Sequence, residues 1–376
     1  MMRPLAGFSL FLIALTFLQT AGCSKQTAEN AFRYPFIRPL HLKREAGKPY
    51  SEYRAFYVLT EDFEPAVESV SDLDYIREVL KFASDLSSQY KIPWTHFVDV
   101  NALAPAFLSD DPQLKQRCQA MIGDLARMTV EGDDCELHLH GPMNRELLDY
   151  VSSEEKIHIK QSGAEAAKPY RQRKSFFFQS FYRQGYRQLV GSLTYGKRLL
   201  ERCVYDGKKQ VLAFRPGGWD HGDNEQDTLL YFQALSDSGL ISNSGLSTGQ
   251  FGGENWRVGN DPGKNVAMVS AGENRLFEVS PTAGPGGYVN PVLPHDLNKL
   301  ANSVKDEMAV IVAVYHLGAL QKTKSEAGKA PRSDAELRAE RETLEQQFKT
   351  AADLAAAKVL YPITLRELLA IISEQQ

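Results

Sequence analysis

The sequence predicts an α/β fold in which parallel strands alternate with helices around a closed or nearly closed barrel. Short runs of apolar residues alternate with amphipathic stretches of helical period, which is the pattern of a mainly parallel sheet. Seven or eight such units in about 300 residues fit a barrel better than an open sheet. Hydrophobic residues make up 43% of the 376-residue chain and charged residues 24%, which is typical of a globular protein.

The predicted strands are short and apolar. Residues 55–60 (AFYVLT) and 95–100 (THFVDV) are rich in the aromatic and β-branched side chains that favour strands. Residues 309–316 (AVIVAVYH) form an apolar run suited to a fully buried strand. The other candidates cover residues 135–140, 211–215, 240–242 and 275–280.

The predicted helices are marked by apolar residues at helical spacing and by capping residues. Residues 71–90 carry such a stripe. A second helix is expected to begin at Asp111, which is followed by a proline, and to end at Gly132. Capping boxes at Ser333 and Thr364 open the last two helices. Two further helices are expected over residues 179–203 and 223–239.

The N-terminus is expected to lie outside the fold. Arg3 provides a positive charge, and residues 8–18 form an apolar core of about eleven residues. A membrane span needs roughly 20 apolar residues, so this core is typical of a secretory signal. The small residues Ala21 and Gly22 then precede Cys23, an ending similar to a bacterial lipobox.

We therefore expect a lipoprotein signal peptide over residues 1–22 and lipidation of Cys23. A plain signal peptide or an uncleaved anchor is the alternative. Residues 23–50 are polar and contain several prolines, which predicts a flexible tether. The barrel then occupies residues 51–376 as one domain, with a Gly- and Asn-rich insertion or lid at 245–274.

Charge and cysteine content exclude two classes of function. The chain has 43 Lys and Arg residues against 47 Asp and Glu residues, so it lacks the basic surplus typical of a nucleic-acid binder. Apart from Cys23, only Cys118, Cys135 and Cys203 remain, without a CxxC pair. A zinc–thiolate site is therefore not expected, and buried thiols are the default interpretation.

A histidine pair is the strongest candidate for a metal site. In parallel α/β barrels the functional residues lie where strands end. His138 and His140 are two residues apart on a predicted strand, so both imidazoles face the same side. Asp62 or Glu64, at the end of the first strand, would supply a carboxylate. Imidazole and carboxylate ligands with an open position suit a divalent metal such as zinc, although such a pair can also be purely structural.

Two other strand ends carry candidate residues. Arg215 would orient a carboxylate or bind substrate oxygens, or else form a buried ion pair. His316 would act as a general acid, or else as a hydrogen-bonded core histidine. Trp219 and Tyr288 lie in predicted rim loops, where their rings would stack on sugars or pack in the core. The remaining histidines, including His96, have no partner at a diagnostic spacing.

An ordered set of motifs resembles the polysaccharide deacetylase family (carbohydrate esterase family four) in a divergent branch. The resemblance extends from residue 55 to about residue 320, and TLRELL at 364–369 matches the closing helix. It implies a distorted (β/α)7 barrel. The motifs are LTEDFEP (59–65), KIPWTHFVDV (91–100), GDDCELHLHG (132–141), FRPGGW (214–219), LFEVSP (276–281) and VAVYHLG (312–318).

The resemblance implies roles for individual residues. Asp62 falls at the position of the catalytic base, His138 at the first metal histidine, Arg215 at the arginine that orients the base, and His316 at the general acid. In the family the base is followed by a metal-binding aspartate, where this chain has Phe63; Glu64 would replace that ligand.

The second metal histidine also departs from the pattern. It normally lies four residues after the first, at a position that is Pro142 here, so His140 would substitute for it.

The resemblance implies a metal-dependent deacetylase that removes N- or O-acetyl groups from an envelope or extracellular polysaccharide. Two alternatives remain: a non-catalytic carbohydrate-binding lipoprotein, and a metal-independent glycoside hydrolase with a carboxylate pair such as Asp62 and Glu136. Ser24 follows the lipobox cysteine where aspartate would signal retention in the inner membrane. The expected location is therefore the periplasmic face of the outer membrane, in a Gram-negative host.

Overall fold

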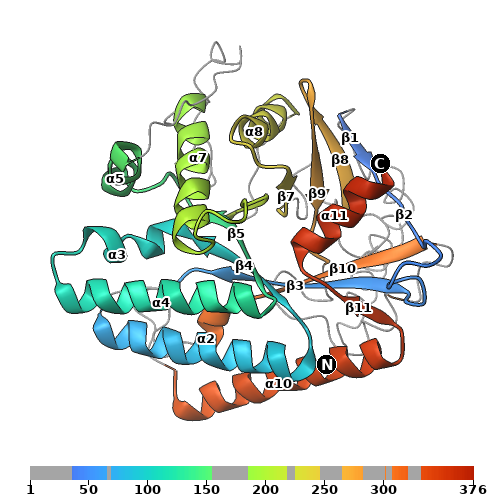
Figure 1. Ribbon diagram of the computed structural model, residues 1–376, viewed down its shortest axis with the longest axis horizontal. Coiled ribbons are helices and arrows are strands. Elements are labelled where there is room, and N and C mark those ends of the chain that lie inside the picture. The colour runs from blue at the N-terminus through green and yellow to red at the C-terminus, as the bar shows by residue number, and fades with distance from the viewer. Residues whose placement is uncertain are drawn as a thin grey trace, which may run out of the picture.

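A curled sheet forms the centre of the computed structural model (Figure 1). The structure describes residues 36–65, 69–154, 185–217, 225–245, 265–282, 301, 307–320 and 332–376. Within these residues, the strands follow the order β1-β8-β9-β7-β6-β5-β4-β3-β10-β2, and β11 pairs with β3 beside this path.

The central part of the sheet is parallel. Neighbours are parallel along the whole path from β10 through β3, β4, β5, β6 and β7 to β9. The predicted barrel with seven parallel strands, (β/α)7, is thereby confirmed. The bounds are β3 (Ala55–Phe63), β4 (Trp94–Asp99), β5 (Asp134–Leu139), β6 (Ala213–Pro216), β7 (Ser242–Asn243), β9 (Asn274–Val279) and β10 (Glu307–Tyr315).

The N-terminal segment of the fold joins the two edges of this sheet. Strand β1 (Ile37–Pro39) pairs antiparallel with β8 (Val266–Ala271), which pairs antiparallel with β9. Only two residues later, β2 (Leu42–Lys43) pairs with β10 at the other edge. Because so short a segment reaches both edges, the sheet must curl until they are close. The backbone N–H of Thr282, just after β9, also donates to Val312 O on β10 at 2.9 Å.

Two predicted boundaries are wrong. The tether was expected to extend to residue 50, but the chain belongs to the fold from residue 36, because Ile37, Leu42 and Tyr50 are buried. The insertion was expected at 245–274, yet residues 266–271 of that range form β8 inside the sheet. Apolar side chains at alternate positions of β8 account for its place in the sheet, despite the Gly- and Asn-rich sequence around it.

The helices of the described residues begin and end close to the predicted positions. Asp111 caps α4, accepting hydrogen bonds from the N–H groups of Gln113 and Leu114, and Gly132 ends that helix. The capping boxes at Ser333 and Thr364 are both formed. The expected helix at 179–203 is present from residue 186, and residues 179–184 lie outside the described part of the chain. The long helices are α2 (Val70–Tyr90), α4 (Pro112–Glu131), α7 (Tyr186–Cys203), α8 (Glu225–Asp237) and α10 (Asp334–Ala356).

Shorter elements complete the described chain. Helix α5 (Arg145–Glu154) packs on α7, and α3 (Pro105–Leu108) packs on α4. Two short 3-10 helices follow the ends of strands, η1 (Val100–Leu103) after β4 and η4 (Leu317–Leu320) after β10. Strand β11 (Leu360–Pro362) leads into the last helix, α11 (Leu365–Gln375).

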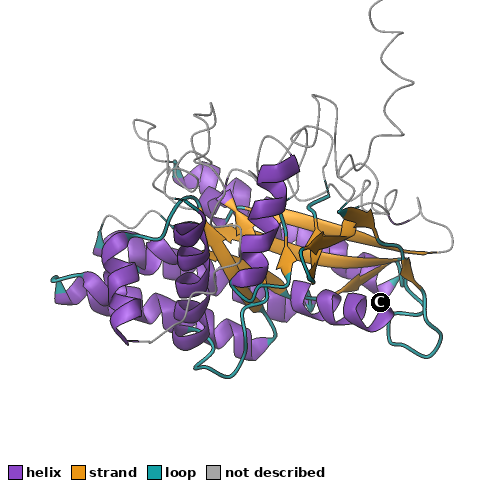
Figure 2. Ribbon diagram, turned by 90° about the horizontal axis from the view of Figure 1, so that it is seen from above, coloured by secondary structure: helices purple, strands orange, loops and turns teal. Residues whose placement is uncertain are grey.

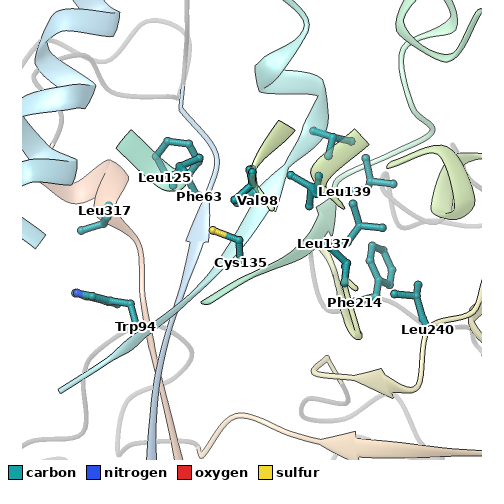
Figure 3. Packing of buried hydrophobic residues seen from close by; sticks show 14 of the residues in the cluster. Phe63, Trp94, Val98, Leu125, Cys135, Leu137, Leu139, Phe214, Leu240 and Leu317 are labelled. Carbon is teal, nitrogen blue, oxygen red and sulfur yellow. The ribbon is translucent and has the colours of Figure 1, made fainter. Parts of the chain in front are cut away.

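Two hydrophobic cores lie on opposite faces of the sheet. On the outer face, Cys135, Leu137 and Leu139 of β5 pack against the helices (Figure 3). Figure 2 shows these helices packed along the fanned strands. The inner core includes Phe97 and Val312 together with apolar residues of α11. Since side chains alternate along a strand, the residues of β5 that lie between those of the outer core face the barrel interior.

Helix α11 closes one end of the barrel interior. Leu365, Leu368 and Ile372 are buried in the inner core. Arg366 Nε lies 3.0 Å from both carboxylate oxygens of Asp134, and its Nη2 lies 3.0 Å from Glu136 Oε1. The beginning of β5, with Asp134 and Glu136, therefore contacts α11. The end of β5, with His138, lies toward the opposite mouth of the barrel.

No helix among the described residues is both long and apolar enough to cross a membrane. Cys118 and Cys135 are buried, Cys203 is partly exposed, and all three are free thiols. The default interpretation of these cysteines as buried thiols holds for two of them, and Cys23 lies outside the described residues.

Candidate active site

Four strands of one continuous part of the sheet bring the predicted polar residues to one end of the barrel. The strands β10, β3, β4, β5 and β6 are consecutive in the sheet, and all of them except β4 carry such a residue. Asp62 lies near the end of β3, His138 near the end of β5 and Arg215 near the end of β6. His316 comes directly after β10. Because the strands are parallel, their carboxyl ends share one rim, and there these side chains meet.

Arg215 and Asp62 form a buried ion pair at the base of the site. Arg215 Nη1 lies 2.7 Å from Asp62 Oδ1, and the side chains are 0% and 5% exposed. The other guanidinium nitrogens donate to Ser244 O, Ser244 Oγ and Thr60 Oγ1, each at 2.9 Å. The guanidinium carbon lies 4.0 Å from the centre of the Phe97 ring. Arg215 is therefore held rigidly, and the orientation of Asp62 follows from it.

The electrostatics of this pair are set by burial. Burial lowers the pKa of Arg215 from its usual value, and the carboxylates of Asp62, Glu278 and Glu64 only partly offset that effect. A guanidinium remains charged at any ordinary pH. Arg215 therefore provides a permanent positive charge beside Asp62.

Glu64 binds both histidines of the predicted metal pair. Its Oε1 atom lies 2.9 Å from His138 Nε2 and 2.7 Å from His140 Nε2. The two imidazole rings are 4.9 Å apart and nearly perpendicular. His138 Nδ1 lies 2.8 Å from Arg215 O, so that nitrogen carries the proton and donates it to the carbonyl. The Nε2 atoms of both histidines thus converge on the same carboxylate oxygen.

The carboxylates around His138 favour its protonated form in the metal-free protein. Burial by itself would lower the pKa of His138, but Asp62, Glu64 and Asp99 outweigh that effect and raise the pKa to about 9. Burial would likewise raise the pKa of Glu64, but its hydrogen bonds and ion pairs with the two histidines hold that pKa well below its usual value. The site therefore attracts positive charge, which a proton supplies here and which a metal ion would also supply.

The donor set fits a divalent metal. Ligand atoms of Glu64, His138 and His140 all lie within 4.8 Å of one another, and the same holds for Asp62, Glu64 and His316. The first set contains one carboxylate and two imidazoles, which bind metal ions in their neutral form. This combination is found in catalytic zinc sites with an open position. Glu64 is the natural ligand of the two acids, because Asp62 already binds Arg215 through one oxygen.

His316 lies on the other side of Asp62. Its Nε2 atom is 3.9 Å from Asp62 Oδ2, which is too long for a hydrogen bond. About a third of the side chain is exposed, so it can reach a bound molecule. With a third of its side chain exposed, His316 is therefore not a fully buried core histidine among the described residues.

Several residues of the site were not found by sequence reasoning. Thr60 and Ser244 hold the guanidinium of Arg215, and Asp99 lies in register with His138 on the neighbouring strand. Asp99 is the last residue of β4, so the rule of searching strand ends would have identified it. Ser244 follows a strand of only two residues, and no sequence signal marks it.

His96 has partners that the sequence did not reveal. It is fully buried, with Nδ1 hydrogen-bonded to Glu61 and Nε2 lying 3.6 Å from Asp133 Oδ2. Asp133 in turn accepts hydrogen bonds from the Trp94 N–H at 2.9 Å and the Ser87 hydroxyl at 2.8 Å. His96 thus has a structural role, on the strand face opposite to Asp62.

Glu136 is not available as a partner for Asp62. The carboxylate is fully buried, and Oε2 accepts hydrogen bonds from the N–H groups of Leu212 and Ala213 at 2.7 Å. Its other oxygen binds Arg366. The carboxylate pair of the glycoside hydrolase alternative is therefore not formed by these two residues.

The predicted substrate-binding residues Trp219 and Tyr288, like the lipidation site Cys23, lie outside the described residues.

Comparison with known proteins finds similarity in structure alone. No family model matches the chain, and no curated protein matches it in sequence. A Mycobacterium smegmatis protein assigned as a polysaccharide deacetylase aligns over 90% of this chain and 96% of its own, with 11% identity and a TM-score of 0.47. A Pseudomonas aeruginosa PAO1 protein with the same assignment aligns over 85% and 91%, with 10% identity and a TM-score of 0.45.

The peptidoglycan deacetylase PdaC of Bacillus subtilis aligns over 86% of this chain and 94% of its own, with 11% identity and a TM-score of 0.33. At these identities and TM-scores, the similar structures assign no role to any residue of this chain. The chemistry of the site follows from its own side chains.

Proposed function

We propose that this protein is a metal-dependent hydrolase that removes acetyl groups from a polysaccharide. The observation that carries the proposal is the arrangement of Glu64, His138 and His140 beside Asp62. Three metal-ligand side chains converge, and a separate carboxylate lies next to them, held by Arg215. Metal-dependent hydrolysis of an amide or ester uses these parts: an ion, a base for water and an acid for the leaving group.

The proposal assigns the metal to Glu64, His138 and His140, with zinc as the expected ion. When bound, a divalent metal would polarise the acetyl carbonyl and lower the pKa of a water molecule. His138 would bind it through Nε2, because the hydrogen bond from Nδ1 to Arg215 O fixes its orientation. His140 would also bind through Nε2, which lies 2.7 Å from Glu64 Oε1. Metal binding would displace the proton that His138 carries in the metal-free protein.

Asp62 would act as the general base. Its Oδ1 atom is occupied by Arg215, which leaves Oδ2 to accept a proton from the attacking water. Arg215 would fix the direction of the free oxygen of Asp62. His316, facing Oδ2 at 3.9 Å, would give a proton to the departing amine or alcohol.

The N-terminus supports a substrate in the cell envelope. A lipid on Cys23 would anchor the protein, and Ser24 favours the periplasmic face of the outer membrane in a Gram-negative host. The segment between the cysteine and residue 36 would separate the barrel from the membrane. An acetylated envelope or extracellular polysaccharide, N- or O-acetylated, is the proposed substrate. Replacing Cys23 with Ser should abolish incorporation of a labelled fatty acid, and unchanged labelling would contradict the anchor.

A non-catalytic carbohydrate-binding protein is the second candidate. Phe63 occupies the position of one family metal ligand, and its side chain is buried in the outer core, where it cannot contribute to an ion site. If Glu64 does not compensate for it, the barrel would bind acetylated glycans without turnover. Binding that is unaffected by chelators, with no acetate released, would identify this case.

The test of the enzymatic proposal combines metal analysis with an assay of acetate release. The wild-type protein should contain about one divalent metal per chain and release acetate from acetylated oligosaccharides, and a chelator should stop the reaction reversibly. The His138→Ala, His140→Ala double variant should lose both metal and activity. His41→Ala is the matched control, since His41 is exposed and pairs with Glu307, the first residue of β10, at the opposite end of that strand from His316. Absence of metal together with full activity of the double variant would refute the proposal.

A further inference from the structure

The end of β6 comes unusually close to the end of β5. In the parallel pair, Leu139 lies opposite Pro216, and the next residue of each chain is His140 and Gly217. A Cβ atom built on Gly217 would lie 2.5 Å from both Cγ and Nδ1 of His140. Any residue other than glycine would therefore overlap the imidazole of His140.

The overlap would extend to the backbone. The same Cβ atom would lie 2.7 Å from His140 Cα. A rotation of the imidazole about its side-chain bonds would not move Cα, so a side chain at position 217 would push the two strand ends apart. Proteins contain essentially no contacts this short, so the two chain segments can be this close only because residue 217 has no side chain.

The ring of His140 is thus confined from two sides. Its Nδ1 edge faces the backbone of Gly217, and its Nε2 atom lies 2.7 Å from Glu64 Oε1. A push from position 217 would displace the ring as a whole and change the direction of Nε2. Metal ligands tolerate little displacement, because ligand distances and angles must stay close to those that the ion prefers.

We propose that Gly217 is a positioning residue, which allows the histidine two residues after His138 to serve as the second imidazole ligand. The segment from Arg215 to Gly217 then aligns both imidazoles: the Arg215 carbonyl orients His138, and the missing side chain at 217 accommodates His140. This inference rests on the metal site of the proposed function.

The first test measures the affinity for zinc by competition with a chelating dye. Gly217→Ala should bind zinc 10- to 100-fold more weakly than the wild type, the range seen when residues that orient metal ligands are changed. Gly196→Ala is the matched control. A Cβ there would also be crowded, at 3.0 Å from Leu137 Cδ1, but on the outer face of β5 and away from His140. It should leave zinc affinity unchanged although it also crowds a buried side chain, more mildly than Gly217→Ala does.

A double-mutant comparison separates positioning from general damage. If Gly217 acts mainly through the His140 ring, the Gly217→Ala change should cost much less affinity in a His140→Ala background than in the wild type. An equal loss in both backgrounds, or wild-type affinity in Gly217→Ala, would overturn the proposal.

A metal-free measurement distinguishes failure of this proposal from failure of the proposed function. Imidazole NMR signals of His140, assigned with His140→Ala, should shift in metal-free Gly217→Ala but remain in place in Gly196→Ala. If the wild type binds no metal, the proposed function is refuted, and the proposed role of Gly217 in metal binding is refuted as well. If the wild type binds zinc but the His140 signals do not move in Gly217→Ala, only the role of Gly217 is refuted.

Discussion

Arg215 holds the carboxylate of Asp62 through a 2.7 Å ion pair, and through its backbone carbonyl it also accepts the Nδ1 proton of His138. One buried residue therefore orients both the proposed base and a proposed metal ligand. The guanidinium is itself fixed by Thr60 and Ser244 and by the ring of Phe97. A change at Arg215 should affect stability and activity together.

Replacing Arg215 with Met should destabilise the fold by about 3–5 kcal/mol, because Asp62 would remain buried without its charge partner. Urea unfolding measures this loss, and acetate release should fall with it. Arg215→Lys should recover part of the stability, since it restores the charge but not the forked hydrogen bonds. Arg117→Met is the control: its partner Asp74 is half-exposed, so the cost should stay below about 1 kcal/mol. Equal losses in the two Met variants would contradict the importance of the buried pair.

Replacing His316 with Ala should lower kcat by about 10²–10⁴-fold, the contribution expected of a general acid. Zinc affinity should remain close to that of the wild type, because the proposed ligands are Glu64, His138 and His140. A loss of zinc in this variant would show instead that His316 is a ligand, as its proximity to Asp62 and Glu64 would allow. Steady-state kinetics and dye competition on the same preparations separate the two results.

His96 should make stability depend on pH. Its pKa in the folded protein is raised to about 10, because the carboxylates of Glu61 and Asp133 outweigh the opposing effect of burial. The unfolded value is about 6.5. A raised folded pKa means that the stabilising effect is complete below about pH 6.5 and is lost as the pH rises through about 10.

The test compares the wild type with His96→Gln in urea at several pH values. At pH 6 the variant should be less stable by about 3–5 kcal/mol, the usual cost of breaking a buried ion pair. This difference should shrink steadily toward pH 10. A difference that is the same at every pH would mean that folding does not raise the pKa of His96. His41→Gln, at an exposed pair, should cost less than about 1 kcal/mol.

Replacing Arg366 with Met should destabilise the barrel without changing the metal site. The variant would leave Asp134 and Glu136 without their cation at the end of the barrel that α11 closes. A loss of about 3–5 kcal/mol in unfolding free energy is expected, with zinc affinity unchanged. A large drop in zinc affinity, measured on the folded variant without urea, would show that α11 influences the opposite mouth of the barrel.

The elements of the fold were largely predictable because their signals are local. The helix at Pro112–Glu131 was found through the residues at its two ends. The side chain of Asp111 caps its first turn and the backbone of Gly132 ends its last turn, so both signals act over a few residues. The strands carrying Asp62, His138 and Arg215 were found from short apolar runs. Residues 37–43 were misassigned because their pairing partners, β8 and β10, lie far away in the sequence. Residues 266–271 were misassigned because the sequence around them is rich in Gly and Asn.

By itself, the sequence determined which side chains lie near strand ends and which of them share a face, since a strand alternates its side chains with a period of two. This was sufficient to select Asp62, Glu64, His138, His140, Arg215 and His316. Only the tertiary structure decided how they divide their roles. Whether Asp62 or Glu64 faces the histidines depends on the register of β3 against β5 and β6, and Arg215 reaches Asp62 across the barrel interior. Contacts of this kind join residues 74 positions apart, as for Glu64 and His138, or 153 positions apart, as for Asp62 and Arg215, and no local pattern encodes them.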